Sequence, residues 1–139
     1  MNIGLLLFIP HRHLENRVLD TISAAGFDVT IAQARLLQRI AANGSRLTEL
    51  AEAAQVTKQT AGFLVDQLEK SGWVERVPDP TDGRARLVCL TDKAKAAAPI
   101  ADGEVARVEA EWEKHVGKRR MAQLRETLEK LCEITDPYR

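Results

Sequence analysis

The sequence predicts a mainly α-helical chain with one small β-hairpin near its middle. Apolar residues recur at helical spacing over most of the 139 residues, and aromatic residues make up only 4% of them. One short stretch, residues 73–90, changes to the alternation that is typical of strands. A chain of this length can bury a hydrophobic core without help from disulfides or metal ions, so we expect a single domain over residues 1–139.

The first helix is expected within residues 2–25, where Leu14, Val18 and Ile22 share one stripe. The apolar run before it ends at Pro10, which disfavours helix at the residue that precedes it. This run needs a partner surface, either on its own domain or on a second copy of the chain. It is too short to span a bilayer and lacks a basic leader and a cleavage site, so we expect no signal peptide and a soluble, cytoplasmic protein.

A second helix is expected from Thr30 to Ala42, after a break at residues 25–29. Its expected buried side is formed by Ala32, Leu36, Leu37 and Ile40. Asn43-Gly44 should end this helix, and Arg46-Leu47 is expected to form a single bridge with the hairpin.

Two short amphipathic helices follow, joined at Gln55-Val56. Thr57 is placed to cap the second of them, and Gly72 is placed to end it. The apolar positions of the pair are Leu47, Leu50, Ala51 and Ala54, then Ala61, Leu64, Val65 and Leu68. Two such helices joined by so short a turn are the parts of a helix-turn-helix.

The hairpin is expected to pair residues 73–77 with residues 86–90, with Val88 and Leu90 on one face. Between them, residues 78–85 ("PDPTDGRA") carry two prolines, two aspartates and a glycine, which predicts a loop. A hairpin with a long, arginine-bearing tip directly after such a helix is a wing.

Two helices complete the chain, the first from Thr91 to about His115, with Pro99 inside it, and the second from Lys118 to about Thr135. Their apolar stripes are Ala101, Val105, Val108 and Trp112, then Met121, Leu124, Leu128 and Leu131. Both ends of the chain therefore carry more apolar surface than one small domain can cover. This predicts a homodimer with an isologous interface.

The middle of the chain resembles the MarR family of winged helix-turn-helix regulators. The family hallmark is matched by Asp82, Arg84, Val88 and Leu90-Thr91, and "LVDQLEKSGWVER" fits the family's helix-to-strand junction. The resemblance implies a winged helix-turn-helix lobe over residues 30–91, flanked by dimerisation helices at 1–25 and 92–139. It also implies a DNA-binding transcriptional regulator, usually a repressor.

Charge alone does not predict a nucleic-acid partner, because twenty basic residues balance twenty acidic ones. The placement of polar residues on the second helix of the pair does predict such a partner, because an α-helix fits the major groove of B-DNA. The residues expected to touch DNA from the second helix of the pair are Thr57 and Lys58 (phosphates), Gln59 and Thr60 (base edges), and Gly62 and Phe63 (close approach or a thymine methyl). Many family members carry a hydroxyl residue and an arginine at the last two positions. This departure predicts modest affinity or an unusual site, and Phe63 could instead contact a protein.

The wing is expected to supply a second anchor. The resemblance places Arg84 where relatives reach the minor groove, with Asp82 holding its guanidinium, and Arg86 is within reach of phosphate. It also implies a small aromatic or anionic effector. The candidate residues for an anion are His11, Arg12, His13 and Arg17, although a solvated helix face explains them equally well.

Other chemistries find little support in the sequence. There is no glycine-rich phosphate loop, nucleophile elbow or HExxH motif, so we expect neither an enzyme nor a cofactor. His11 and His13 are two residues apart, a poor spacing for zinc on a helix, so no metal is expected. Cys89 and Cys132 form no pairing pattern. The alternative is a winged-helix protein-interaction module with weak or no specific DNA binding.

Overall fold

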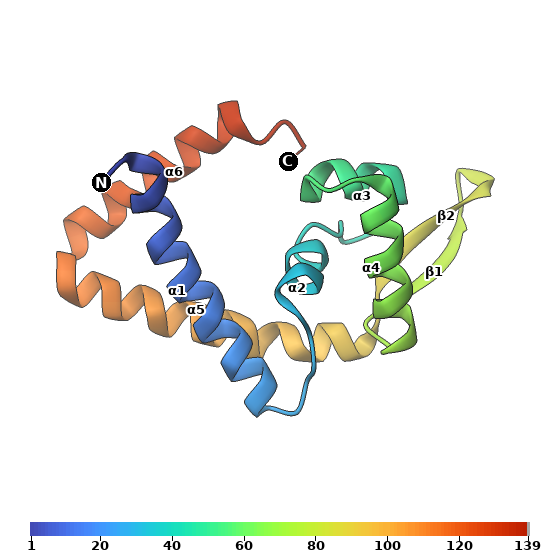
Figure 1. The fold of residues 1–139 in the computed structure, drawn as a ribbon, viewed down its shortest axis with the longest axis horizontal. Coiled ribbons are helices and arrows are strands. Elements are labelled where there is room, and N and C mark those ends of the chain that lie inside the picture. Colours follow the sequence, from blue (N-terminus) through green and yellow to red (C-terminus); the bar gives the residue numbers. More distant parts are fainter. Residues whose placement is uncertain (139) are drawn as a thin grey trace. The chain divides into compact units, whose positions relative to one another are not determined.

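The fold was obtained as a computed structural model that describes residues 1–138 (Figure 1). In chain order the elements are α1 (Ile3–Ala24), α2 (Ile31–Leu37), α3 (Leu47–Ala54), α4 (Lys58–Lys70), β1 (Val74–Asp79), β2 (Asp82–Leu90), α5 (Asp92–Val116) and α6 (Lys118–Thr135). The predicted fold class, mainly helical with one hairpin wing, is confirmed. Contacts group the residues into two compact units. We call Val29–Ala98 the winged unit, and Met1–Asp28 with the described residues from Pro99 onward the terminal unit.

The core of the winged unit is formed by the apolar faces that the helical spacing predicted. Leu36 of α2, Leu50 of α3 and Leu68 of α4 are almost completely buried. Trp73 and Val74 close this core at the start of the hairpin. Because α2, α3 and α4 each contact the other two, the helix-turn-helix pair packs on a third helix.

The hairpin is longer than predicted. Antiparallel pairing runs from Val74↔Leu90 to Asp79↔Asp82, with an irregularity between Pro78 and Asp79. The expected loop at residues 78–85 is therefore wrong, because strand pairing extends almost to the tip. Polar side chains do not prevent this pairing, which uses backbone groups, and a two-stranded sheet has open edges where a proline is tolerated. The expected bridge at Arg46-Leu47 lies instead at Ser45, which pairs with Val88.

The second helix is shorter than predicted, because α2 ends at Leu37 and not at Ala42. Past that point the chain turns, and the Ser45 hydroxyl oxygen accepts a hydrogen bond from the Ala41 N–H at 2.9 Å. A side chain that takes up a backbone donor in this way competes with the helix ladder. Among the expected buried positions, Leu36 and Ile40 are buried and Leu37 is half-buried, but Ala32 is exposed.

In the terminal unit, α1 continues through Pro10, so the expected loss of helix before this proline is wrong. The first turn is capped by Asn2, whose side-chain oxygen accepts from the Leu5 N–H at 2.9 Å. A proline inside a helix removes one hydrogen bond, and the capped, leucine-rich turns before Pro10 retain theirs.

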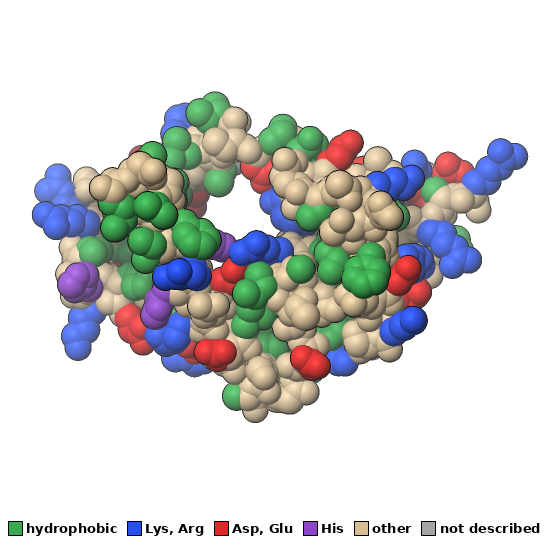
Figure 2. Space-filling view, in the orientation of Figure 1, with side chains coloured by type: hydrophobic (Ala, Val, Ile, Leu, Met, Phe, Trp, Pro, Cys, Tyr) green, Lys and Arg blue, Asp and Glu red, His purple; other side chains and the backbone are tan. Residues whose placement is uncertain are grey.

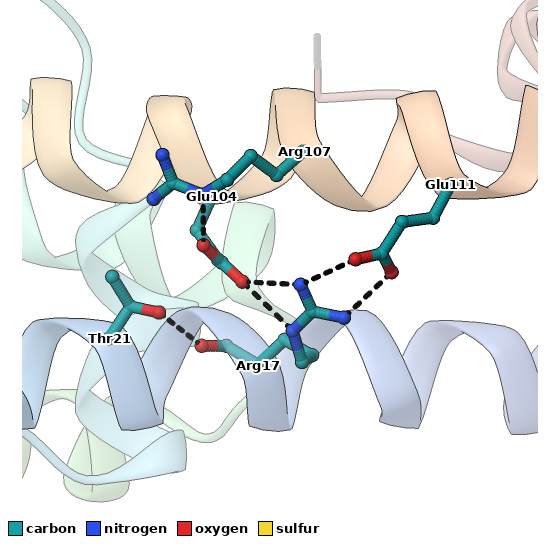
Figure 3. A network of polar contacts seen from close by, with 5 residues as sticks. All are labelled: Arg17, Thr21, Glu104, Arg107 and Glu111. Atoms are coloured by element: carbon teal, nitrogen blue, oxygen red, sulfur yellow. Dashed lines mark hydrogen bonds and ion pairs between the residues drawn. The ribbon is translucent and has the colours of Figure 1, made fainter.

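A network of charges joins α1 to α5 (Figure 3). The Arg17 guanidinium donates to Glu104 and to Glu111, each at 2.8 Å, and Arg107 donates to the other oxygen of Glu104 at 2.6 Å. Glu104 is buried, and its two arginines hold the pKa of its carboxyl below the usual value despite that burial. Bidentate arginine pairs of this kind fix the geometry between two helices.

The last two helices agree with their predicted bounds, and α6 begins at Lys118 after Gly117. They are linked by an ion pair between Arg125 of α6 and Glu109 of α5. The predicted stripe of α6 is present, yet Leu124, Leu128 and Leu131 are 37–43% exposed. Apolar side chains likewise gather on the surface over the N-terminal part of α1 (Figure 2), where Ile3 and residues 5–9 are 39–72% exposed.

Candidate nucleic-acid interface

The first turn of α4 presents polar groups to solvent. Thr57 caps the helix, and its hydroxyl oxygen accepts from the Thr60 N–H at 3.0 Å, as the sequence predicted. Lys58, Gln59 and Thr60 are exposed together with their cap. A helix start carries unpaired N–H groups and a partial positive charge, both of which favour phosphate.

The opposite side of α4 is fixed in the core. Ala61, Leu64, Val65 and Leu68 are buried, which sets the rotation of the helix about its axis. The outward side therefore carries the polar first turn and, next to it, Phe63, whose surface is 62% exposed. The structure thus brings the six predicted α4 positions, residues 57–60, 62 and 63, onto one short helical segment.

An arginine of the hairpin anchors the outer side of α4 to β1. Arg76 donates to Asp66 and to Glu69 of α4, each at 2.8 Å. Sequence reasoning missed this residue as part of the site. The only signal for it was its position on the first strand, and nothing in a single sequence pairs it with carboxylates seven and ten residues earlier.

A second arginine anchors the hairpin near its tip. Arg46, which precedes α3, donates to the buried Asp79 carboxylate from two nitrogens, at 3.0 and 2.8 Å. The other oxygen of Asp79 accepts from the N–H and the hydroxyl of Thr81 at 2.9 and 2.7 Å. The Thr81 hydrogen bonds, followed by the one from Arg46, lower the pKa of Asp79 to about 2. The turn at Pro80-Thr81 is therefore tied to the helix-turn-helix, a contact that sequence reasoning also missed.

The wing arginines lie beyond this anchor. Arg84 and Arg86 are exposed, and within the described part of the chain neither has a carboxylate partner. Asp82 was expected to hold the Arg84 guanidinium, but its Oδ1 accepts from the Arg84 backbone N–H at 3.1 Å, and its Oδ2 lies 4.0 Å from Arg46. The expected side-chain pair between Asp82 and Arg84 is therefore wrong. Asp82 binds the backbone of the tip and leaves the guanidinium of Arg84 unbound.

Ion pairs determine which charged side chains of the winged unit remain open to solvent. Three carboxylates beside α4 and the hairpin tip, Asp66, Glu69 and Asp79, are each bound by Arg46 or Arg76. Lys58, Arg84 and Arg86 are left with their charges directed to solvent. The three cations expected to meet DNA are therefore not neutralised by these carboxylates, although the winged unit also exposes Glu49, Glu52 and Glu75.

The predicted anion residues of α1 are in different situations. Arg17 is bound by Glu104 and Glu111 (Figure 3), which raises the pKa of its guanidinium. His11 lies 3.5 Å from Glu15, and the Arg12 guanidinium stacks over the Phe8 ring at 5.6 Å. His13 is exposed. Arg17 thus has its charge satisfied within the protein, which leaves His11, Arg12 and His13 as the more accessible of the four.

Within residues 1–138, no helix combines the length and the apolar character that crossing a membrane requires.

Comparison with known proteins gives consistent results. Residues 27–85 match the family model described as "MarR family". A relative from Bacillus subtilis, the uncharacterized HTH-type transcriptional regulator YybA, is 33% identical over 88 residues, which is 60% of this chain and 59% of YybA. The chain therefore aligns with about three-fifths of the length of that relative.

Two solved structures extend the likeness to almost the whole chain. Wild-type MarR from E. coli in its apo form has a TM-score of 0.74 and 28% identity, over 94% of this chain and 97% of that one. The transcriptional repressor CouR bound to a 23-mer DNA duplex has a TM-score of 0.73 and 26% identity, over 94% and 92%.

The fold and its exposed helix define a winged helix-turn-helix protein. The resemblance to the MarR family is confirmed, and residues 27–85 are a MarR-family winged-helix segment. The relatives named above are transcriptional regulators, which agrees with the prediction that the chain is not an enzyme.

Proposed function

We propose that this protein is a DNA-binding transcriptional regulator that acts as a homodimer on a pseudo-palindromic operator. The observation that carries the proposal is the state of α4: its apolar side is locked in the core, while its capped first turn, Thr57 to Thr60, is exposed. The structure of CouR, a similar protein bound to a DNA duplex, supports it.

In this proposal α4 enters the major groove with its N-terminus leading. Thr57 and Lys58 bind phosphate at the helix start, where the unpaired N–H groups also point. Gln59 and Thr60 reach base edges, because the major groove presents a distinct pattern of donors and acceptors for each base pair. Gly62 leaves room for the backbone to approach closely, and Phe63 lies beside it.

The hairpin supplies the second contact. Arg84 inserts into the minor groove and Arg86 binds phosphate, while Asp82 fixes the tip backbone from which both extend. The Arg76–Asp66 pair holds the hairpin against α4, and the Arg46–Asp79 pair holds it at the start of α3. Two anchors of fixed separation on one rigid unit give a defined register on the duplex.

Dimerisation is supported by the exposed apolar residues of the terminal unit. Ile3 and residues 5–9 on α1 and Leu124, Leu128 and Leu131 on α6 are between 37% and 72% exposed. Exposed apolar surface of this extent marks an interaction site. Two copies joined by an isologous interface would read half-sites about one helical turn, roughly 34 Å, apart.

The finer part of the proposal is repression that is relieved by a small aromatic or anionic ligand. His11, Arg12 and His13 are exposed side chains of α1 that an anion could reach, and Arg17 would have to exchange a carboxylate for the ligand. A ligand that favours one spacing of the two α4 helices would shift the protein between binding and non-binding states.

The test is a gel shift with the duplex upstream of the protein's own gene, repeated over a series of salt concentrations. Counterion release predicts that the logarithm of the binding constant falls linearly with the logarithm of the salt concentration. Retardation with such a slope supports the proposal. A protein that retards no duplex at low salt would instead be the protein-interaction module that the balanced charge also allows.

A further inference from the structure

One large apolar side chain of α4, the helix proposed to contact DNA, is exposed to solvent. Phe63 is 62% exposed, and among the large apolar residues described in the winged unit only Ile31, at 39%, is also exposed. The other large apolar residues of α4, Leu64, Val65 and Leu68, are buried. The phenylalanine therefore contributes little to the core of its own unit.

The position of Phe63 joins it to the polar first turn. It lies four residues after Gln59 and three after Thr60, so these side chains are neighbours on one strip of α4. One turn further on, Asp66 is bound by Arg76 at 2.8 Å, and the Gln67 side chain accepts from Gln33 at 3.2 Å. Asp66 and Gln67, beyond Phe63, are thus bound to other elements. Before Phe63, Lys58 and Gln59 are exposed, and the Thr57 hydroxyl donates to the Thr60 hydroxyl at 2.9 Å within the first turn of the helix.

The residue before Phe63 is a glycine for which packing gives no reason. A Cβ added at Gly62 would meet Leu47 Cδ2 at 3.8 Å, an ordinary contact, and the backbone there is helical. Glycine inside a helix costs stability relative to alanine. A site without a side chain next to an exposed aromatic ring allows a flat surface to approach the backbone closely.

We propose that Phe63 reads the C5-methyl group of a pyrimidine in the major groove, either of thymine or of 5-methylcytosine. This inference rests on the proposed function. The methyl group is the apolar feature on the base edges of the major groove, and a phenylalanine ring is a suitable partner for it. Gln59, one turn earlier on the strip, would bind the edge of a neighbouring base, so that α4 combines polar and apolar recognition.

The experiment begins with a duplex selected by the wild-type protein from a random library. Each thymine of the half-site is then replaced by deoxyuridine, which removes one methyl group and leaves base pairing intact. At one symmetric position we expect the dissociation constant to rise about fourfold for each methyl group, or roughly 15-fold for both half-sites, at constant salt.

Phe63→Ala should bind the thymine duplex about as weakly as the wild type binds the deoxyuridine duplex, and it should be insensitive to the replacement. Phe63→Leu, which keeps an apolar group, should retain part of the sensitivity. Ile31→Ala is the matched control: it truncates the other exposed apolar residue of the winged unit and should leave the deoxyuridine effect unchanged.

A second arm separates the two sources of the methyl group. At the sensitive position a T·A pair is replaced by C·G, with cytosine either unmodified or methylated at C5. Recovery of affinity on methylation shows that the methyl group itself is read, whereas recovery that requires the T·A pair shows a thymine reader.

Two results overturn the inference and are distinguishable. A selected duplex that binds tightly but shows no sensitive thymine, or equal sensitivity in Phe63→Ala, removes Phe63 as a methyl reader and leaves the proposed function standing. If the wild-type protein enriches no duplex at low salt, the proposed function and the inference fall together.

Discussion

The winged unit and the terminal unit use their apolar residues in opposite ways. In the winged unit the large apolar side chains of the described residues are buried or half-buried, and only Ile31 and Phe63 are exposed. In the terminal unit Ile22 and Val108 are buried, while the start of α1 and most of the α6 stripe are exposed. One unit satisfies its hydrophobic surface within itself, and the other does not.

The polar contacts differ in a corresponding way. In the winged unit, Arg46 and Arg76 bind carboxylates that fix the hairpin against the helices. In the terminal unit, the Arg17–Glu104 pair joins α1 to α5 (Figure 3). The apolar residues near the start of α1 are exposed. The comparison teaches that the winged unit covers most of its apolar surface by itself, while the terminal unit leaves apolar surface exposed, as the proposed homodimer requires.

The largest expected effect is a loss of self-association when charges are placed on the exposed apolar part of α1. Leu6→Asp with Ile9→Asp should weaken self-association at least roughly 100-fold, because each apolar side chain buried in an interface contributes about 1.5–3 kcal/mol. Sedimentation equilibrium measures the effect. Ile31→Asp is the matched control, since Ile31 and Ile9 are equally exposed at 39%. Equal association of both variants, or a monomeric wild type, would contradict the role of the terminal unit.

Two glycines with the same backbone angle test how tightly each unit is packed. Gly44 and Gly26 both have φ of +92°, but a Cβ at Gly44 would lie 2.6 Å from Cys89 Sγ and 3.1 Å from Leu87 Cβ, whereas Gly26 has nothing within 4 Å. Gly26→Ala should therefore cost only the left-handed backbone, about 1–2 kcal/mol. Gly44→Ala should add the overpacking, a further ~1–3 kcal/mol. Urea denaturation of both variants gives the difference, and equal losses would show that Cys89 and Leu87 move aside freely.

The hairpin tip can be tested separately from both cores. Arg84→Ala should weaken operator binding by about 1–3 kcal/mol, because it removes an unbound guanidinium from the surface proposed to meet DNA. Unfolding and self-association should stay as in the wild type, since Arg84 is exposed and its backbone N–H, which binds Asp82, remains. Arg84→Lys keeps the charge and should lie between the two. Identical affinity of all three proteins across a salt series would exclude Arg84 from the interface.

Local patterns predicted the elements well. The cap at Thr57, the end of α4 before Gly72 and the bounds of α6 all follow from residues within a few positions of one another. The hairpin length and the end of α2 were less predictable, because they depend on backbone pairing and on the Ser45–Ala41 hydrogen bond. Neither leaves a periodic trace in the sequence.

The candidate site, too, could be predicted only in part from the sequence. The α4 positions could be read from helical spacing, but the arginines that support them could not. Arg46 and Asp79 are 33 residues apart, and Arg76 and Asp66 are ten residues apart in different elements. One sequence contains no signal that joins such positions, because long-range ion pairs are set by the fold and not by local propensity.

The smallest expected effect concerns the anchor of the hairpin and appears only in acid. The pKa of Asp79 is lowered to about 2 from an ordinary 3.8, so this carboxylate stabilises the folded state fully above pH 3.8 and loses that contribution as the pH falls toward 2. Asp79→Asn keeps an oxygen for the Thr81 N–H but removes the charge that Arg46 binds. The variant should be less stable than the wild type at neutral pH, and the difference should shrink between about pH 4 and pH 2. Urea unfolding at several pH values measures it. The acid sensitivity that remains in the variant would then report the other lowered carboxyls, Glu104 and Glu111 of the terminal unit. A difference that stayed constant down to pH 2 would show that the Asp79 charge does not hold the hairpin.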